Sequence, residues 1–277
     1  MKNAFVLLLI LSSTTFQTFS QNTALIPAPA QRTHEGKFFL LWGYNRSAYT
    51  NSDIQVKGLG YDFTAYNVKA DDYPEAFSPD VYFNIYKLTI PQFNFRLGYY
   101  IRERVSLSFG WDHLKYRLNH QQTVKVDGDY VQDGEVRHFD NEEVFLSRNF
   151  FHLEHTDGLN FLRFNYDYAI PLIGNRSRKL SLDAIVGAGI GPVCPWTDAV
   201  LDSKRYRTFF RPAGAGIATN VTMRANLGGS FFIQTTGRVG AIKLIDVYID
   251  PEIRGKQQFA YAEFNITAGF TFGKKNK

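Results

Sequence analysis

Seven charged side chains stand out because each lies among small or uncharged residues on one face of an alternating segment. They are Arg96, Asp112, Arg163, Asp167, Asp183, Arg238 and Glu263. Every second side chain of a β-strand points to the same face, and in these segments the other face is apolar. If the segments enclose a common interior, its arginines and carboxylates should pair and fill it as a polar core. A gated pore or a proton path along these groups is the alternative.

A second candidate is the histidine and carboxylate of residues 153–158, which read LEHTDG. In a strand, His155 and Asp157 would project from the same face. The segment is similar to the His-x-Ser-Asn element of two membrane-embedded esterase families, outer-membrane phospholipase A and the lipid A deacylase PagL. That resemblance implies His155 as the base, but Asp157 occupies the position of the serine nucleophile, and the Thr156 hydroxyl would face the opposite way. We therefore expect no catalytic site, with a lipid hydrolase using His155 as the alternative.

The acidic stretch 126–143, VDGDYVQDGEVRHFDNEE, contains oxygen ligands at the spacing of some calcium sites. The candidate ligands are Asp127, Asp129, Asp133 and Glu135. An EF-hand needs a carboxylate or amide at its fifth position and glycine at its sixth, and this stretch has neither. A solvated acidic loop is therefore predicted, divalent-cation binding is the alternative, and no cofactor is expected.

Large amphipathic aromatic residues cluster toward the ends of the alternating segments. They are Trp42, Tyr44, Tyr99, Trp111, Tyr166 and Tyr168. Such rings are favoured at the headgroup level of a membrane. The placement predicts anchoring at the membrane interfaces rather than ligand binding.

The element that must position all these groups is a strand with one apolar face, and residues 259–272 (FAYAEFNITAGFTF) show it most clearly. Positions from Ala260 to Phe272 on one parity are apolar, whereas the other parity carries polar or small residues. Eight such strands are predicted, at residues 37–50, 89–101, 105–118, 158–172, 180–193, 207–223, 230–249 and 259–272. Long and short connections alternate between them. The pattern predicts an all-β, closed antiparallel transmembrane barrel with long external loops and short periplasmic turns.

The rest of the chain is consistent with export. Residues 1–20 have the basic start, apolar centre and small residues of a signal peptide, residues 21–36 suit a periplasmic lead-in, and residues 274–277 would form a periplasmic tail after a barrel at 37–273. The single Cys194 cannot form an internal disulfide. A formal net charge of +5 without a basic cluster predicts no nucleic-acid partner.

Taken together, the signal peptide, the eight alternating strands and the terminal aromatics Phe270 and Phe272 resemble the small outer-membrane barrel class that includes OmpA and OmpX, and uncharacterised barrel proteins of diderm bacteria. The resemblance implies an outer-membrane location and contact with outer-membrane lipid and lipopolysaccharide. The expected function is a structural or binding role through the external loops at 51–88 and 119–157, with a possible protein partner there. An accessory subunit of a larger envelope complex is a further alternative.

Overall fold

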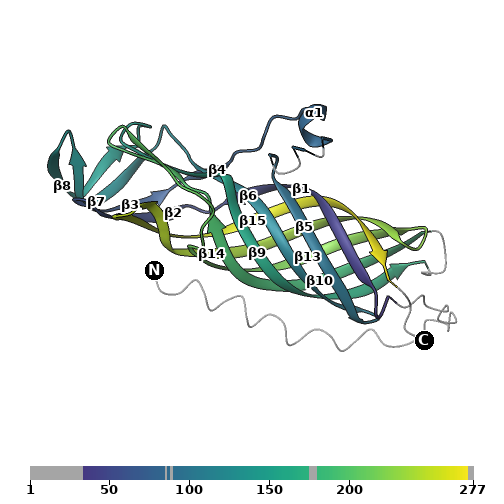
Figure 1. Ribbon diagram of the computed structural model, residues 1–277. Helices are drawn as coiled ribbons and strands as arrows, with labels where there is room; N and C mark the ends of the chain where they lie inside the picture. Colours follow the sequence, from purple (N-terminus) through teal and green to yellow (C-terminus); the bar gives the residue numbers. More distant parts are fainter. Residues whose placement is uncertain (1–33, 85, 88–89, 175–179, 274–277) are drawn as a thin grey trace, which may run out of the picture.

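The computed structural model describes residues 34–84, 86–87, 90–174 and 180–273. The predicted signal peptide, most of the lead-in, and the tail at 274–277 lie outside these residues. Eight strands form a ring in the order β1, β5, β6, β9, β10, β13, β14 and β15 (Figure 1). Their bounds are Phe38–Tyr49, Phe93–Arg102, Val105–Leu118, Phe151–Ile173, Leu180–Pro195, Gly214–Leu227, Phe231–Asp250 and Ile253–Phe272.

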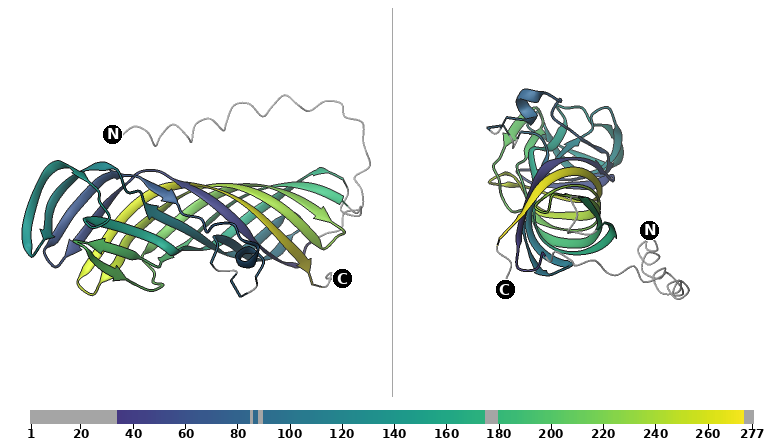
Figure 2. Two further views of the ribbon diagram at one scale, coloured as in Figure 1. Left: turned by 90° about the horizontal axis from the view of Figure 1, so that it is seen from above. Right: turned by 90° about the vertical axis from the view of Figure 1, so that its right-hand side faces the viewer.

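The ring is closed by antiparallel pairing of its first and last strands. β1 pairs with β15 from Phe38, opposite Phe272, to Tyr49, opposite Tyr261. The view along the axis in Figure 2 shows the strands surrounding a common interior. Closure leaves no open edge in this ring, which a sheet surrounded by lipid requires. The predicted closed eight-stranded antiparallel barrel is confirmed.

One end of the barrel has tight turns. Arg102 pairs directly with Val105, so only two residues connect β5 to β6. Between β13 and β14, Gly228 and Gly229 both adopt positive φ, at 67° and 92°, a conformation that glycine reaches without steric cost. Short turns mark the periplasmic end of an outer-membrane barrel, so the opposite end is extracellular.

At the extracellular end, the long connections fold into further β-structure that we call the extension. β15 continues the sheet into β2 (Ser52–Gly58), β3 (Tyr61–Val68), β7 (Thr123–Gln132) and β8 (Glu135–Phe145). β4 (Ala70–Asp72) adds to β6, while β11 (Asp198–Leu201) pairs with β9 and β12 (Lys204–Arg207). Figures 1 and 2 show the extension prolonging the barrel along its axis.

The extension has its own apolar core. Buried side chains from β2, β3, β7 and β9 meet there, with Phe63 packed edge-on against Phe151 at 5.4 Å between ring centroids. The segments predicted as long loops are therefore ordered sheet over much of their length. The short helix α1 (Pro79–Tyr82) lies outside the barrel wall, where Tyr82 packs on Tyr44 of β1, rather than on the extension (Figure 1).

Several predicted strand bounds are wrong. The sixth barrel strand begins at Gly214 instead of residue 207, because residues 204–207 pair with β11 and Pro212, which lacks an amide donor, intervenes. The fourth begins at Phe151 and the eighth at Ile253, since both strands extend beyond the membrane. The turn predicted at Asp133 and Gly134 is confirmed: both have positive φ, and Gln132 pairs with Glu135.

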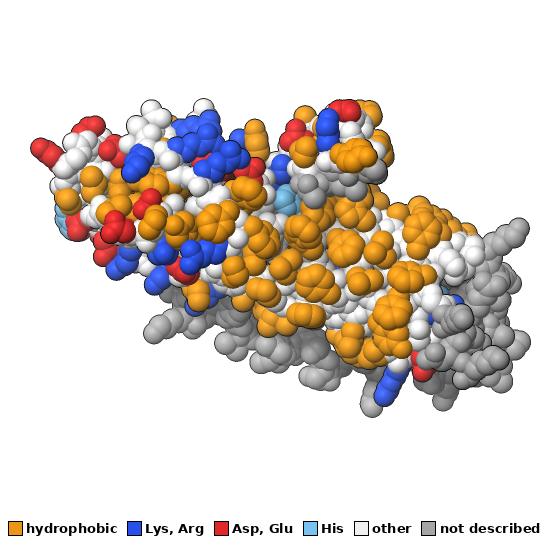
Figure 3. Space-filling model, in the orientation of Figure 1, with side chains coloured by type: hydrophobic (Ala, Val, Ile, Leu, Met, Phe, Trp, Pro, Cys, Tyr) orange, Lys and Arg blue, Asp and Glu red, His pale blue; other side chains and the backbone are white. Residues whose placement is uncertain are grey.

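The outer wall of the barrel carries a belt of exposed apolar side chains, seen as the hydrophobic surface over the barrel in Figure 3. Charged side chains gather instead over the extension and α1. On β15, outward residues from Ala260 to Phe272 belong to the belt, whereas Glu263 and Asn265 between them face inward and are buried. None of the helices in the described ranges is long and apolar enough to span a membrane.

Candidate functional site

The polar interior of the barrel centres on the carboxylate of Asp112, which is fully buried. Its Oδ1 lies 2.6 Å from Arg96 Nη2, and its Oδ2 lies 2.8 Å from Arg163 Nε and 3.3 Å from Arg238 Nη1. Arg238 Nη1 also contacts Glu263 Oε1 at 2.5 Å. These five residues form the lumen network, in which three guanidinium groups share two carboxylates.

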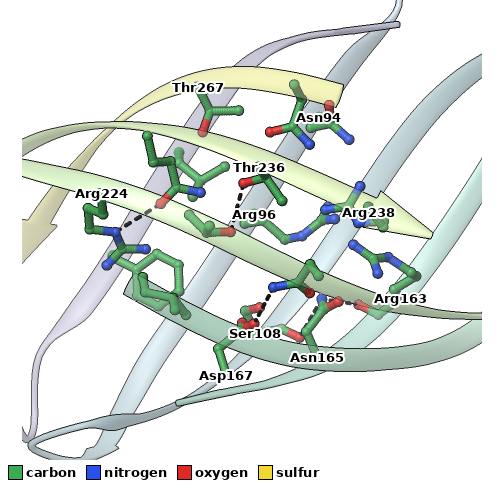
Figure 4. A pocket seen from close by; sticks show the side chains of 17 residues that line it. Asn94, Arg96, Ser108, Arg163, Asn165, Asp167, Arg224, Thr236, Arg238 and Thr267 are labelled. Atoms are coloured by element: carbon green, nitrogen blue, oxygen red, sulfur yellow. Dashed lines mark hydrogen bonds between the residues drawn. The ribbon is translucent and has the colours of Figure 1, made fainter. Parts of the chain in front are cut away.

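Strand register brings these charges together. Arg238 lies directly opposite Glu263 on β14 and β15, and Asp112 lies opposite Asn94 on β5. The amide of Asn94 donates to Asp112 Oδ1 at 2.6 Å and to Glu263 Oε1 at 3.0 Å, which links the two carboxylates. Figure 4 shows the guanidinium groups of Arg96, Arg163 and Arg238 gathered at one end of the lumen cavity.

Glycine provides the space that one of these arginines needs. A Cβ at Gly110 would lie 2.3 Å from Arg96 Nη1 and 2.5 Å from its Cζ. The side chain of Arg96 therefore passes over a position where only hydrogen fits. This arrangement agrees with the general use of inward glycines in narrow barrels, where they leave room for bulky neighbours.

On the periplasmic side of the lumen network, the barrel contains a small polar cavity. Its volume is about 40 Å³, which is room for a few water molecules at most. Arg224 lies at the end away from the network (Figure 4), where it donates to Gln234 Oε1 at 2.9 Å and to the Tyr100 hydroxyl at 2.5 Å. The Thr222 and Thr236 hydroxyls are 2.8 Å apart. Hydrogen-bonded side chains, rather than open water, thus fill this part of the barrel.

Apolar clusters lie on both sides of this polar layer. Toward the extension, a buried cluster includes Leu114, Tyr116 and Phe161. Toward the periplasmic turns, Phe39 and Phe232 pack with Leu41 and Tyr100. The polar interior is therefore enclosed between two apolar layers.

Asp167 and Asp183 also face the interior, but neither has an arginine of the lumen network within salt-bridge distance. Asp167 Oδ1 accepts a hydrogen bond of 3.2 Å from Asn220, and Asp183 Oδ2 accepts one of 2.8 Å from Asn226. Of the seven predicted charges, the structure brings five into one network and places these two nearer the periplasmic end. Two further polar residues of the interior, Asn94 and Arg224, are not among the predicted charges. Parity alone places Asn94 on the inward face, whereas the predicted end of the sixth strand at residue 223 leaves Arg224 in a turn, although β13 continues to Leu227.

The structure separates the two candidate hydrolase residues. His155 is buried, with its Nδ1 3.1 Å from Thr197 Oγ1, whereas Asp157 is exposed and bound to Arg207 at 2.5 Å. The expectation that they share a face is wrong. Between the pairs Leu114–Leu159 and Tyr116–His155, β9 has two more residues than β6, so this bulge turns Asp157 outward.

The hydroxyl beside His155 therefore belongs to Thr197, which is far away in the sequence. Both side chains are buried, at 0% and 1% exposure. A hydroxyl next to an imidazole is the arrangement of an activated nucleophile, but this pair lies inside the protein and is packed against Tyr116, whose ring centroid is 5.7 Å from that of His155. The contact is best explained as an interior hydrogen bond that orients the imidazole.

The four acidic residues considered as metal ligands do not converge. Asp129 Oδ1 lies 2.8 Å from His138 Nδ1, and Asp133 lies in the hairpin turn, where its amide donates to Asp202 at 3.0 Å. Asp127 pairs with Thr64 of β3, and Glu135 pairs with Gln132. Within the described ranges, no group of three histidine, cysteine or acidic residues is arranged to hold a metal ion.

The six predicted interface aromatics fall into two groups at opposite ends of the barrel. Near the extension, Trp42 packs edge-on against Tyr44 at 4.5 Å, and Trp111 donates to Asn160 Oδ1 at 2.8 Å. Nearer the periplasmic end, Tyr99 packs on Phe38 at 4.8 Å. Tyr166 and Tyr168 are exposed on β9. Aromatic girdles flanking an apolar band are typical of barrels that span the outer membrane.

A closed barrel with this belt, a polar interior and one set of short turns fits a bacterial outer membrane. The chain is an integral outer-membrane β-barrel protein. This agrees with the class of small barrels suggested by the sequence.

Comparison with known proteins adds only fold-level similarity. No family model and no curated protein matches the sequence. Among solved structures, the chain resembles the outer-membrane protein OprG from Pseudomonas aeruginosa, with 9% identity, 87% of this chain and 97% of that chain covered, and a TM-score of 0.42. It also resembles Ail, the attachment invasion locus protein of Yersinia pestis, with 14% identity, coverage of 86% and 99%, and a TM-score of 0.32. At this level of similarity, neither structure identifies a function for this barrel.

Proposed function

We propose that this protein is a non-conducting membrane anchor that holds a folded extracellular binding platform. The observation that carries the proposal is the interior of the barrel, where the lumen network lies between two apolar layers. An eight-stranded barrel is just wide enough for side chains to fill its interior. A filled lumen leaves the extension as the part available for interaction.

Two features support a binding role for the extracellular part. The extension has a hydrophobic core and is continuous with the barrel sheet, so it presents its surface in a fixed orientation. On the barrel wall near the extracellular end, residues 77–83, which we call the α1 segment, expose large aromatic rings: Phe77 is 71% exposed and Phe83 75% exposed. Tyr44 on the barrel wall donates a hydrogen bond to the Tyr82 carbonyl, which fixes the α1 segment to the barrel. Exposed aromatic groups on a fixed support suit contact with a protein partner.

The proposal that the barrel does not conduct is tested by reconstituting the refolded protein in liposomes. Sugar uptake is then measured, with an open porin as the positive control. We expect no uptake above that of protein-free liposomes. Uptake by a preparation that is folded, as shown by heat-modifiable gel mobility, would contradict the proposal.

The proposal that the extracellular part binds a protein partner is tested in living cells with a photo-crosslinking amino acid. It is placed at Phe83 on the α1 segment, at Val136 on β8, and at Val221 in the lipid belt as the control. A discrete protein adduct at Phe83 or Val136, but not at Val221, is expected. Absence of adducts at both extracellular positions, with normal assembly of the barrel, would argue against a protein-binding platform.

The hydrolase alternative has no comparable support, because His155 and Asp157 lie on different sides of the strand. Incubation with phospholipid and lipid A, followed by mass spectrometry, should show no released fatty acid in the wild type. Release that disappears in His155→Ala would restore the alternative.

A further inference from the structure

The lipid-facing wall of the barrel contains an apolar groove of about 820 Å³. Small residues such as Ala188, Gly189 and Ala241 form its floor, and larger outward residues, including Phe164 and Ile190, form its sides. Its lining comes from β6, β9, β10, β13, β14 and β15, so the groove crosses strands instead of following one.

Strand register gives the direction of the groove. From β6 to β14 its lining residues form a row of directly paired positions: Leu107 opposite Tyr166, Tyr166 opposite Ala188, Ala188 opposite Thr219, and Thr219 opposite Val239. The lining then steps two residues along β14 to Ala241, which pairs with Ala260 of β15. Leu107 lies two residues after the start of β6, beside a periplasmic turn. Ala260 lies at the other margin of the belt, where β15 enters the extension. The groove therefore runs obliquely across the belt and reaches its extracellular margin.

Lysines lie at that extracellular margin. Lys243 follows Ala241 by two residues on the same outward face of β14, and Lys256 lies on the outward face of β15. Both are exposed, and within the described ranges neither has a carboxylate at ion-pair distance. The nearby Asp246 is already bound to Arg254 at 3.2 Å. Cations without acidic partners thus stand where lipid headgroups meet the barrel.

We propose that this groove is a binding site for a phosphate-bearing glycolipid of the outer leaflet. One acyl chain lies along the groove floor, and a headgroup phosphate contacts Lys243 and Lys256. The surroundings of the groove are hydrocarbon, so an acyl chain is the occupant that the membrane itself supplies. Charge complementarity at the extracellular margin selects an anionic headgroup over a neutral one. The site lies on the wall, apart from the platform of the proposed function.

The test is native mass spectrometry of the folded protein in nanodiscs. These contain bis-phosphorylated lipid A, its dephosphorylated form or phosphatidylglycerol. We expect the wild type to retain the phosphorylated lipid A preferentially. Lys243→Gln and Lys256→Gln should each reduce that retention about fivefold, which is the effect of removing one basic residue near an anionic membrane surface. Lys125→Gln on β7, where the lysine is also exposed, is the matched control and should behave as wild type.

A second pair of variants tests the groove independently of charge. Ala188→Phe fills the floor and should reduce retention of both forms of lipid A, whereas Ala268→Phe, on the outward face of β15 outside the groove lining, should not. Equal retention of phosphorylated and dephosphorylated lipid A, or equal retention by the two phenylalanine variants, would overturn the proposal. Equal retention of phosphatidylglycerol would also overturn it. A protein dimer that Ala188→Phe abolishes would assign the groove to a second copy instead. The sugar-uptake experiment is unaffected by any of these outcomes.

Discussion

The barrel and the extension share strands, among them β9, β14 and β15, but have opposite interiors. Within the belt, β14 buries Gln234, Thr236 and Arg238 and exposes Ile233 and Val239. Beyond the belt, the same strand buries Ile242 and Leu244 and exposes Lys243. The polarity of each face reverses because the surroundings change from hydrocarbon to water. A single strand thus carries both patterns, and its sequence shows where it leaves the membrane.

The largest expected effect comes from removing the centre of the lumen network. Asp112→Ala leaves the buried guanidinium groups of Arg96 and Arg163 with no carboxylate at ion-pair distance among the described residues, while Arg238 keeps Glu263. Breaking a buried ion pair in this way typically costs about 3–5 kcal/mol. We expect the variant to unfold at a much lower urea concentration than the wild type. Unfolding is monitored by the heat-modifiable gel mobility of the folded barrel.

Ser108→Ala is the control for that variant, because the Ser108 side chain also faces the lumen but its buried Oγ has no hydrogen-bond partner within the described residues. It should leave the unfolding midpoint nearly unchanged. If both variants unfold alike, the lumen network is not the source of barrel stability.

The matching change in the extension is Ile54→Ala, in its apolar core. Removing a buried aliphatic side chain costs about 2–5 kcal/mol, but here the loss should be local. Amides of β2 and β3 should exchange faster with deuterium while the barrel keeps its gel mobility.

Val136→Ala, at an exposed position of β8, serves as the control for Ile54→Ala. Loss of barrel gel mobility in Ile54→Ala would show that the two regions unfold as one cooperative unit.

A smaller effect tests how tightly the lumen is filled. Gly110→Ala places a methyl group 2.3 Å from Arg96 Nη1, and overpacking of this kind costs about 1–3 kcal/mol. Gly237→Ala is the matched control, since a Cβ there has no neighbour within 4 Å. Comparable urea midpoints for the two variants would mean that the lumen adapts to the added volume.

The smallest effect concerns an exposed pair on the extension. Asp129 hydrogen-bonds His138 and raises the pKa of that imidazole above its usual value. The stabilisation should be present below the unfolded-state pKa of histidine and be lost as the pH rises through the higher pKa of the folded state. Asp129→Asn should lower the pKa of His138, measured by NMR titration. An unchanged pKa would show that the carboxylate does not act on it.

The comparison also shows what the sequence can reveal. Alternation in the belt is strict, because lipid on one side and a filled lumen on the other impose it on every residue, and this predicted all eight barrel strands. In the extension, Ile54 and Val56 alternate and pair with Ala65 and Phe63 across a short hairpin. The outer edges of this hairpin pair with β15 and β7, which are far along the chain. The hairpin is short and its sheet partners are distant, so the sequence pattern predicts a loop here although the segment is ordered sheet.

The candidate site could be predicted only in part, because alternation gives the direction of each side chain but not the register between strands. Parity alone gave the inward direction of Arg96, Asp112 and Arg163, but which charges meet depends on register between strands. The bulge before Leu159 could not be anticipated from residue types, although Gly158, at φ 139°, permits it. That bulge separated His155 from Asp157.

Pairing between the first and last barrel strands has a consequence for biogenesis. Phe38 meets Phe272 only after β15 has been made, so the seam forms later than the pairing of β1 with β5 can. The extension depends on the same strand, because β2 pairs with β15 at Arg254 to Gln257. A chain truncated before β15 would have neither a closed wall nor the edge on which β2 assembles. An ordered extension therefore requires that β15 has been synthesised and inserted into the barrel wall.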